Sequence, residues 1–136
     1  MRKRVSKIVK QEVAIRANFC CEYCLLPEFA SFYTFHIEHI RSIKHGGTSD
    51  TENLAYGCPD CNFSKGSDIA TFTENDEDII RFFNPRKDIW SAHFEIQEGA
   101  IYGKTEIGIA TVKIFKFNDL ERLIFRQQLI QFSLYP

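Results

Sequence analysis

The sequence predicts an α+β fold whose metal-stabilised core, residues 20–68, carries the chemistry. Two Cys-x-x-Cys pairs bracket this core, which is the arrangement of a four-cysteine zinc site. Short aromatic and β-branched runs between the pairs indicate strands, whereas helical periodicity recurs before the core and near the C-terminus. We therefore expect one domain over residues 1–136. It would have an N-terminal helix and a hairpin-plus-helices extension over residues 79–136.

Composition and charge narrow the class of protein. With 44% hydrophobic and 26% charged residues, the chain resembles an ordinary soluble globular protein. No apolar run approaches the ~18 residues that span a bilayer and no signal-peptide pattern is present, so we expect a cytoplasmic protein without a membrane partner. The net charge of −1 argues against a protein that coats nucleic acid by bulk charge, but is compatible with a local basic patch.

An amphipathic helix is expected over residues 3–18. Apolar side chains recur there at helical spacing, with Lys and Arg on the opposite face. That basic face is either a solvated surface or one that faces phosphates. The apolar positions are Val5, Ile8, Val9, Val13 and Ile15, and the basic ones are Arg2, Lys3, Arg4, Lys7, Lys10 and Arg16, against the single acid Glu12.

The core itself should contain a turn, a strand, a loop, a second strand and a helix, in that order. Glycines mark the loop because they adopt backbone dihedrals that other residues avoid. Proline marks the start of the helix because it is tolerated in a first turn. The expected elements are a turn over residues 20–27, a strand over 32–40, a loop over 45–50, a strand over 54–56, and a helix from Pro59 to about Gly66.

The C-terminal half begins with a polar, acidic stretch over residues 73–78. Alternating residues over 94–103 predict a small hairpin that turns near Glu98 and Gly99. Two helices are expected to follow, over residues 105–115 and 118–133.

Four cysteines, Cys21, Cys24, Cys58 and Cys61, have the spacing of a tetrahedral Zn²⁺ site. Each Cys-x-x-Cys turn places two thiolates on one side, and two such turns complete the coordination. The alternatives are reduced, buried cysteines or a redox pair. The fifth cysteine, Cys20, is expected to be a buried apolar residue or a spare thiol. A zinc ion here would tie the start of the core to its end and stabilise the fold.

Polar residues between the cysteine pairs suggest a second, open metal site. Three ionisable residues within four positions of an otherwise apolar strand are costly to bury without a task. The chemistry that fits is phosphodiester hydrolysis, in which a neutral histidine takes a proton from water and a divalent cation stabilises charge on the phosphate. Oxygen ligands favour Mg²⁺ or Mn²⁺ as that cation. The residues concerned are His36, Glu38, His39, His45, Asn53 and Asn62.

These motifs resemble the HNH endonucleases of the ββα-metal type over residues 21–66. The shared pattern is a pair of Cys-x-x-Cys steps around an acid-His-hydrophobe step, a Gly-Gly loop, Asn-Leu, and Cys-x-x-Cys-Asn-x-x-Lys. The resemblance implies that His39 is the general base and that Glu38 and Asn62 bind the catalytic metal. It also implies that Asn53 holds the loop and orients the base, and that Lys65 binds phosphate.

Two positions depart from the family pattern. Glu38 stands where the wider family often has Asp, and Ser42 stands where a proline often follows. Adjacent strand residues face opposite sides, so Glu38 and His39 share a site only if the strand bends or ends there. His36 would share a face with Glu38, and is either a further ligand or a packed histidine. His45 is expected to be a loop residue or a phosphate contact.

The chain beyond the core is similar to a small bacterial subgroup of these nucleases. The similarity includes a Phe-Asn-Pro-Arg run at residues 83–86, then Trp90 and His93-Phe94, and a Gly-Ile-Ala-Thr-Val run at residues 108–112. No chemistry is assigned to these positions, His93 included.

Double-stranded DNA is the expected substrate. One site per chain cuts one strand per event, so double-strand cleavage would require a homodimer or two encounters. A non-cleaving zinc-ribbon module that binds nucleic acid also explains the cysteines and the basic helix. It does not explain why all five predicted site residues are present: Glu38, His39, Asn53, Asn62 and Lys65. A scaffold that uses its Phe-rich C-terminal half as an interface is the third alternative.

Overall fold

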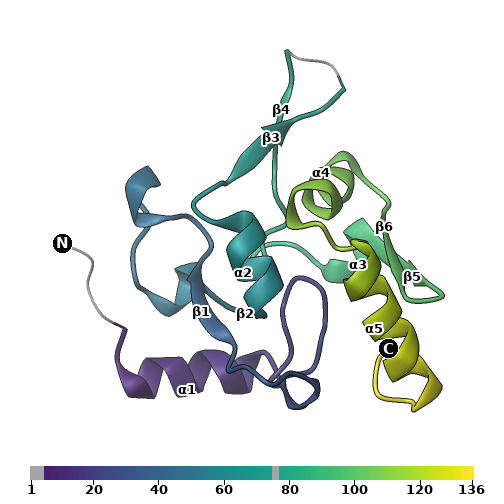
Figure 1. The fold of residues 1–136 in the computed structure, drawn as a ribbon. Helices are drawn as coiled ribbons and strands as arrows, with labels where there is room; N and C mark the ends of the chain where they lie inside the picture. Colours follow the sequence, from purple (N-terminus) through teal and green to yellow (C-terminus); the bar gives the residue numbers. More distant parts are fainter. Residues whose placement is uncertain (1–4, 75–76) are drawn as a thin grey trace. The chain divides into compact units, whose positions relative to one another are not determined.

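The computed structural model describes residues 5–74 and 77–136, and the chain divides into two compact units, Met1–Ile69 and Ala70–Pro136 (Figure 1). Each unit combines helices with small two-stranded antiparallel sheets. The α+β class expected from the sequence is consistent with this architecture. Whether the two units act as the single expected domain stays a prediction.

The first unit opens with helix α1, Lys7–Arg16, which is shorter than the expected helix over residues 3–18. Asn18 and Phe19 adopt positive φ angles, which end the helix. Val13 and Ala14 are buried, but Ile8 and Ile15 are 70% and 66% exposed, so the expected apolar face is only partly used. The expected basic residues Arg2, Lys3 and Arg4 lie outside the described residues.

Strands β1, His36–His39, and β2, Leu54–Gly57, pair antiparallel, with His36 opposite Gly57 and His39 opposite Leu54. Strand β1 is shorter than the predicted strand over residues 32–40, whereas β2 agrees with its prediction. Every residue of β2 is buried because α1 packs against it. The sheet thus places the end of β1 beside the start of β2.

Helix α2, Pro59–Lys65, follows β2 directly, as expected. Proline occupies its first turn, and the sulfur of Cys58 accepts a hydrogen bond from the Cys61 amide at the helix start. The helix ends at Gly66, whose φ of 54° lies in the left-handed region. The strand–strand–helix order of the sequence prediction is therefore present in residues 36–65.

The connection between β1 and β2 is a tightly folded loop with two 3₁₀ turns, Ile43–His45 and Thr51–Asn53. Gly46 has φ of 81°, and a Cβ at Gly47 would lie 1.7 Å from the Arg41 carbonyl oxygen. Only glycine fits at Gly47 because the backbone of Arg41 occupies the space of a side chain. The predicted glycine loop is therefore a close backbone approach.

The second unit confirms the hairpin and both C-terminal helices of the sequence prediction. Glu98 and Gly99 form the hairpin turn with positive φ angles. The structure adds one strand pair and one short helix that the sequence did not indicate; Asn75 and Asp76 of the acidic stretch lie outside the described residues. The elements are β3, Ala70–Phe72; β4, Ile79–Arg81; α3, Trp90–His93; β5, Phe94–Gln97; β6, Ala100–Gly103; α4, Glu106–Phe115; and α5, Leu120–Gln131.

Aromatic side chains form the core of this second unit. Phe94 lies between Phe83, Trp90 and Phe117, with ring centroids 4.9 to 5.8 Å apart. Phe83 of the Phe-Asn-Pro-Arg run, Trp90 and the His93-Phe94 pair are therefore parts of one packed centre. Their unassigned role in the sequence has a structural explanation.

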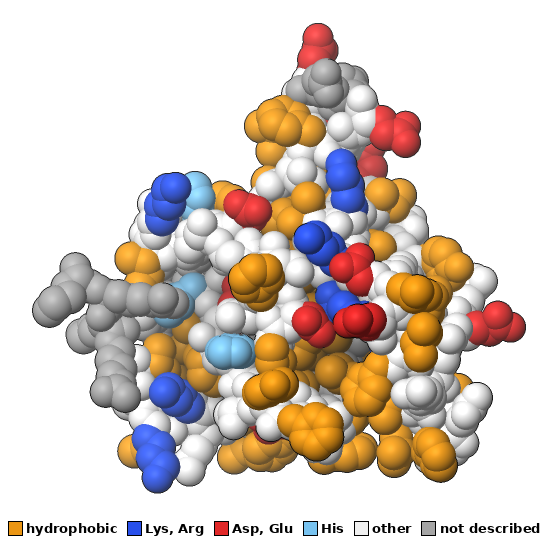
Figure 2. Space-filling view, in the orientation of Figure 1, with side chains coloured by type: hydrophobic (Ala, Val, Ile, Leu, Met, Phe, Trp, Pro, Cys, Tyr) orange, Lys and Arg blue, Asp and Glu red, His pale blue; other side chains and the backbone are white. Residues whose placement is uncertain are grey.

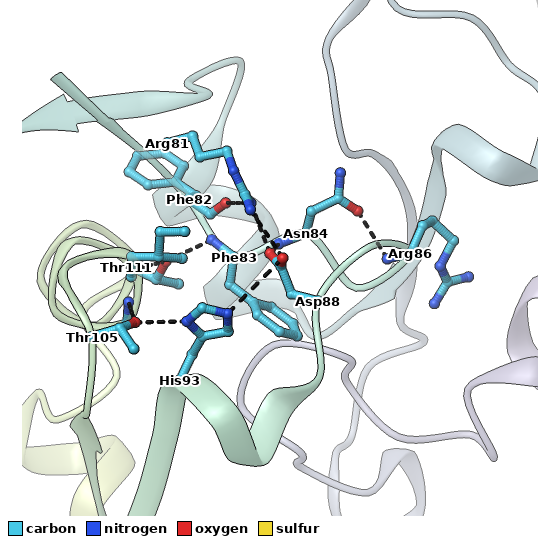
Figure 3. Close-up of polar contacts among 11 residues, drawn as sticks. Arg81, Phe82, Phe83, Asn84, Arg86, Asp88, His93, Thr105 and Thr111 are labelled. Atoms are coloured by element: carbon cyan, nitrogen blue, oxygen red, sulfur yellow. Dashed lines mark hydrogen bonds and ion pairs between the residues drawn. The ribbon is translucent and has the colours of Figure 1, made fainter.

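A polar network borders that aromatic core (Figure 3). Asp88 accepts two hydrogen bonds from the Arg81 guanidinium, at 2.7 and 3.0 Å, and one from the Asn84 amide at 2.9 Å. His93 lies 3.9 Å from Asp88 through Nε2 and 2.6 Å from the Thr105 hydroxyl through Nδ1. This network ties the end of β4 to α3 and to the start of α4.

Within residues 5–74 and 77–136, no helix has the length and apolar character that a membrane crossing requires.

Candidate functional site

The four cysteines of the two Cys-x-x-Cys pairs form one buried cluster. Their sulfur atoms all lie within 4.8 Å of one another, and the Cys24 and Cys58 sulfurs are 3.7 Å apart. A tetrahedral ion with Zn–S bonds of about 2.3 Å separates its sulfurs by about 3.8 Å. The cluster of Cys21, Cys24, Cys58 and Cys61 is therefore compatible with a structural zinc ion.

Backbone turns hold these sulfurs in place. The Cys24 amide donates to the Cys21 sulfur at 3.5 Å, and the Cys61 amide donates to the Cys58 sulfur at 3.4 Å. Such N–H···S hydrogen bonds stabilise negative charge on sulfur and so favour metal-bound thiolates. Cys20 lies outside the cluster; its backbone pairs with Pro27.

The electrostatics of the cluster are compatible with a bound cation. Burial is the main cause that raises the pKa of the Cys21 and Cys61 thiols well above their usual range. Thiolates at these positions would be strongly disfavoured without a positive ion, whereas zinc deprotonates its thiol ligands outright. Four clustered cysteines with no disulfide thus fit a metal better than a redox pair.

A pocket of about 410 Å³ opens at the end of β1. Its lining brings together Glu38 and His39 from β1 and Asn62 from α2. The strand ends at His39, so the side-chain alternation of a regular strand no longer separates His39 from Glu38. The remaining lining residues are Ile37, Ser42, Ile43, Lys44, Gly66 and Ser67.

Glu38 is a buried carboxylate on the pocket wall, only 4% exposed. The ammonium of Lys65, itself 2% exposed, lies 2.7 Å from a Glu38 oxygen, and the Tyr23 hydroxyl interacts with the same carboxylate. Burial raises the pKa of the Glu38 carboxyl, while Lys65 and Tyr23 lower it in part. The site thus holds a carboxylate with one buried counter-ion at the edge of a water-accessible pocket.

His39 is held at the pocket wall by Ser49. The Nε2 atom of His39 lies 3.0 Å from the Ser49 hydroxyl, and the histidine is 6% exposed. This contact fixes the orientation of the ring. Ser49 lies within the glycine loop, and no motif in the sequence marked it, because the folding of residues 41–53 brings it to His39.

Asn53 does not line the pocket but organises the loop beside it. Its carboxamide oxygen accepts from the Arg41 amide at 2.9 Å, and its nitrogen donates to the Arg41 and Thr48 carbonyls at 2.9 and 2.7 Å. All three contacts lie between β1 and β2. Such a side chain replaces the backbone hydrogen bonds that an irregular loop lacks.

The other predicted site residues lie in different surroundings. The Lys65 ammonium also donates to the His39 carbonyl at 3.1 Å, so a direct phosphate contact would require its buried pair with Glu38 to open. His36 is exposed at the far end of β1 and does not line the pocket. His45 is exposed on the 3₁₀ turn of the loop and does not line the pocket either.

Residues 21–68 match the family model described as HNH endonuclease. No curated protein and no solved structure matches the chain. The recognition of this family from motif residues is confirmed for the segment that contains both cysteine pairs and all of the predicted site residues. Such a domain implies a nuclease-type or nucleic-acid-binding role.

Proposed function

Because residues 21–68 match the HNH endonuclease family model, we propose that this protein is a metal-dependent endonuclease that hydrolyses phosphodiester bonds of DNA. The observation that carries the proposal is the convergence of Glu38, His39 and Asn62 on one open pocket. A ββα-metal core is the corresponding architecture. The order of β1, β2 and α2 over residues 36–65 supports it.

We propose that His39 is the general base. A neutral imidazole has an unperturbed pKa of about 6.5, which suits removal of a proton from water near neutral pH. His39 lines the pocket, and the Ser49 hydroxyl holds the orientation of the ring. Asn53 acts at a distance from the substrate by fixing the loop that contains Ser49.

Glu38 and Asn62 are proposed to hold the catalytic divalent cation, Mg²⁺ or Mn²⁺. Both line the pocket, and the Asn62 side chain makes no hydrogen bond to any described residue. Carboxylate and carboxamide oxygens suit these ions, which supply charge stabilisation for the phosphate and the leaving oxygen. The exposed position of His36 outside the pocket leads us to propose that it is not a ligand. Lys65 would then balance the charge of Glu38 before the cation arrives.

The four-cysteine cluster is proposed to bind Zn²⁺ as a structural ion. Its cysteines flank both the Tyr23 turn and the start of α2, and Glu38 and Asn62 depend on those two segments for their positions. Zinc would therefore set the geometry of the pocket without taking part in the reaction.

One observation favours the alternative of a module that binds nucleic acid without cutting it. Glu38 already has a buried partner in Lys65, 2.7 Å away, and a cation would have to compete with that ammonium. If the pair does not yield, the pocket keeps its shape but binds no catalytic metal.

A plasmid-nicking assay tests the proposal. Purified protein would be incubated with supercoiled DNA in Mg²⁺, in Mn²⁺ and in EDTA, with His39→Ala beside the wild type. We expect nicking that requires the added metal and is abolished by His39→Ala, because the variant lacks the group that accepts the proton. His36→Ala serves as the matched control, since it removes the same kind of side chain from β1 outside the pocket.

Zinc content and thermal unfolding of each variant show whether the fold is retained. Absence of cleavage on plasmid, single strands and RNA with every divalent ion would reject the nuclease and leave the binding module. Loss of folding in His39→Ala would make this histidine structural. A product distribution that passes from nicked to linear DNA as protein concentration rises would indicate a homodimer or a second encounter.

A further inference from the structure

The site contains two lysines whose surroundings differ. Lys65 is 2% exposed, lies 2.7 Å from Glu38 and donates to the His39 carbonyl at 3.1 Å. Lys44 is exposed, lines the pocket, and makes no hydrogen bond or ion pair with any described residue. The charge of Lys65 is thus used inside the protein, whereas the charge of Lys44 faces the space that a substrate would enter.

The loop that carries Lys44 is held rigidly against the pocket. The His45 and Gly47 amides both donate to the Ser42 carbonyl, at 2.9 and 3.0 Å, and the Ser42 hydroxyl donates to the Ser67 carbonyl at 3.2 Å. Arg41 donates to the Gly46 carbonyl at 2.9 Å. These contacts fix the backbone of the 3₁₀ turn Ile43–His45, so little loop entropy is lost when Lys44 binds a ligand.

Ser42, which stands where the family often has proline, has a part in this arrangement. Its φ of −62° is one that proline also adopts, so the backbone does not require the serine. Its hydroxyl instead joins the loop to Ser67, just after the end of α2, and both serines line the pocket with Lys44. The substitution therefore fixes the distance between the Lys44 turn and the helix that carries Asn62.

The electrostatics of the pocket favour an anion at Lys44. On the face drawn in Figure 2, Lys and Arg side chains are dispersed among acidic, polar and hydrophobic ones and do not form one broad patch. With a net charge of −1, the chain depends on individual contacts to attract phosphates. Among the residues that line the pocket, Lys44 is the lysine that no acidic group of the described chain neutralises.

We propose that Lys44, rather than Lys65, is the residue that binds the backbone phosphate of the nucleic acid in this pocket. The inference rests on the proposed function, because it assigns the substrate contact of the same site. Lys65 is then a positioning residue that holds Glu38 and the end of β1. The Lys44 ammonium would pair with a non-bridging phosphate oxygen beside His39.

The test measures DNA binding without cleavage. The affinity for a fluorescent duplex would be determined by anisotropy without added divalent cation, on protein that retains its structural zinc, over a series of KCl concentrations, for wild type, Lys44→Gln, Lys44→Arg and Lys104→Gln. Lys104 is an exposed lysine of the second unit that does not line the pocket, so its variant loses the same charge without altering the pocket lining. Plasmid nicking with Mg²⁺ gives KM and kcat for the same four proteins.

We expect Lys44→Gln to bind about tenfold more weakly, since one charge-assisted contact is lost. The slope of log affinity against log salt should fall by about 0.9, the value for one phosphate contact. Lys44→Arg should keep the affinity and the salt slope of wild type, because it keeps the charge. In Lys44→Gln, KM for nicking should rise by a larger factor than kcat falls. Lys104→Gln should have an affinity and a salt slope close to those of wild type. A Lys44→Gln protein with wild-type affinity and slope would overturn the inference while leaving the nuclease intact. A wild-type protein that neither binds nor cuts nucleic acid would instead reject the proposed function, and this inference with it.

Discussion

The two units use the same kinds of polar residue in different ways. In the first unit, Glu38, His39 and Asn62 converge on a pocket at the end of a short strand. In the second unit, Asp88 and His93 are enclosed in a network with Arg81, Asn84 and Thr105 (Figure 3). The first arrangement lines an open pocket, and the second holds elements together.

The surroundings of a polar residue distinguish a candidate site from a structural network more clearly than the residue type does. His39 and His93 each contact one hydroxyl group, Ser49 and Thr105 respectively. His39, however, lines a pocket next to a buried carboxylate, whereas His93 packs against the Phe83 ring beside an acid that already accepts two hydrogen bonds from Arg81. A saturated network of this kind stabilises the fold but has little capacity to bind a substrate.

Removal of zinc should have the largest effect on stability. It should unfold the first unit and leave the second unit folded. In Cys58→Ser, we expect loss of bound zinc and of the structure of the first unit, because metal binding and folding are coupled in such clusters. The single tryptophan, Trp90, packs 4.9 Å from Phe94 in the second unit and reports on that unit alone. Its emission should persist while amide hydrogen exchange within residues 21–68 becomes fast.

The control is Cys20→Ser, which alters a cysteine outside the cluster. It should keep one zinc ion per chain, measured by atomic emission spectroscopy. A stable, zinc-free Cys58→Ser protein would contradict the structural role of the metal. Simultaneous loss of the Trp90 signal would show that the two units fold as one, so that the second unit also depends on zinc.

The buried pair of Glu38 and Lys65 should have the next largest effect. Lys65→Met leaves a buried carboxylate without its counter-ion, and removal of one partner of such a pair costs about 3–5 kcal/mol of unfolding free energy. The double variant Lys65→Met/Glu38→Gln should recover part of this loss, because the uncompensated charge is also gone. Denaturant unfolding with zinc present measures both values.

Lys44→Gln is the matched variant for this experiment, since it removes an exposed lysine from the pocket that Glu38 lines. We expect its unfolding free energy to equal that of wild type. A Lys65→Met protein as stable as wild type would show that Lys65 is not needed as a counter-ion, and would return it to the role of a phosphate contact.

Much of the first unit could be predicted because its motifs are local in sequence. The Cys-x-x-Cys spacing identified the cluster, and Pro59 and Gly66 marked the ends of α2 correctly. The pairing of Lys65 with Glu38 could not be predicted, because it depends on how α2 packs against β1. The same is true of Ser49, which reaches His39 only through the folded loop.

In the second unit, some elements could be predicted from the sequence, whereas the contacts between them could not. The turn at Glu98 and Gly99 could be predicted because glycine tolerates positive φ, and helical patterns indicated α4 and α5. Strands β3 and β4 were missed because three residues each are too few for a clear alternation. The Asp88 network joins residues from 81 to 105, a span over which sequence patterns give no contact information.

Protonation of Asp88 should produce the smallest effect, and it is followed in the second unit alone because acid also displaces zinc from cysteine thiolates such as those proposed in the first. The Arg81 guanidinium, through its hydrogen bonds, is the main cause that lowers the pKa of the Asp88 carboxyl. A lowered pKa adds stability that is present above the unfolded-state value of about 3.9 and is lost as pH falls through the lower folded-state value. Arg81 is half exposed, so we expect a contribution of about 1 kcal/mol or less.

Unfolding followed by Trp90 emission between about pH 5 and pH 3 would measure this contribution, since that range crosses the ordinary carboxyl pKa. In Asp88→Asn the loss of stability on acidification should be smaller than in wild type. Asp119→Asn is the matched control, because Asp119 is exposed at the start of α5 and its side chain makes no capping hydrogen bond. An unchanged pH dependence in Asp88→Asn would mean that the network holds through its neutral hydrogen bonds. In that case charge pairing would not be the property that distinguishes the Asp88 network of the second unit from the pocket residues of the first.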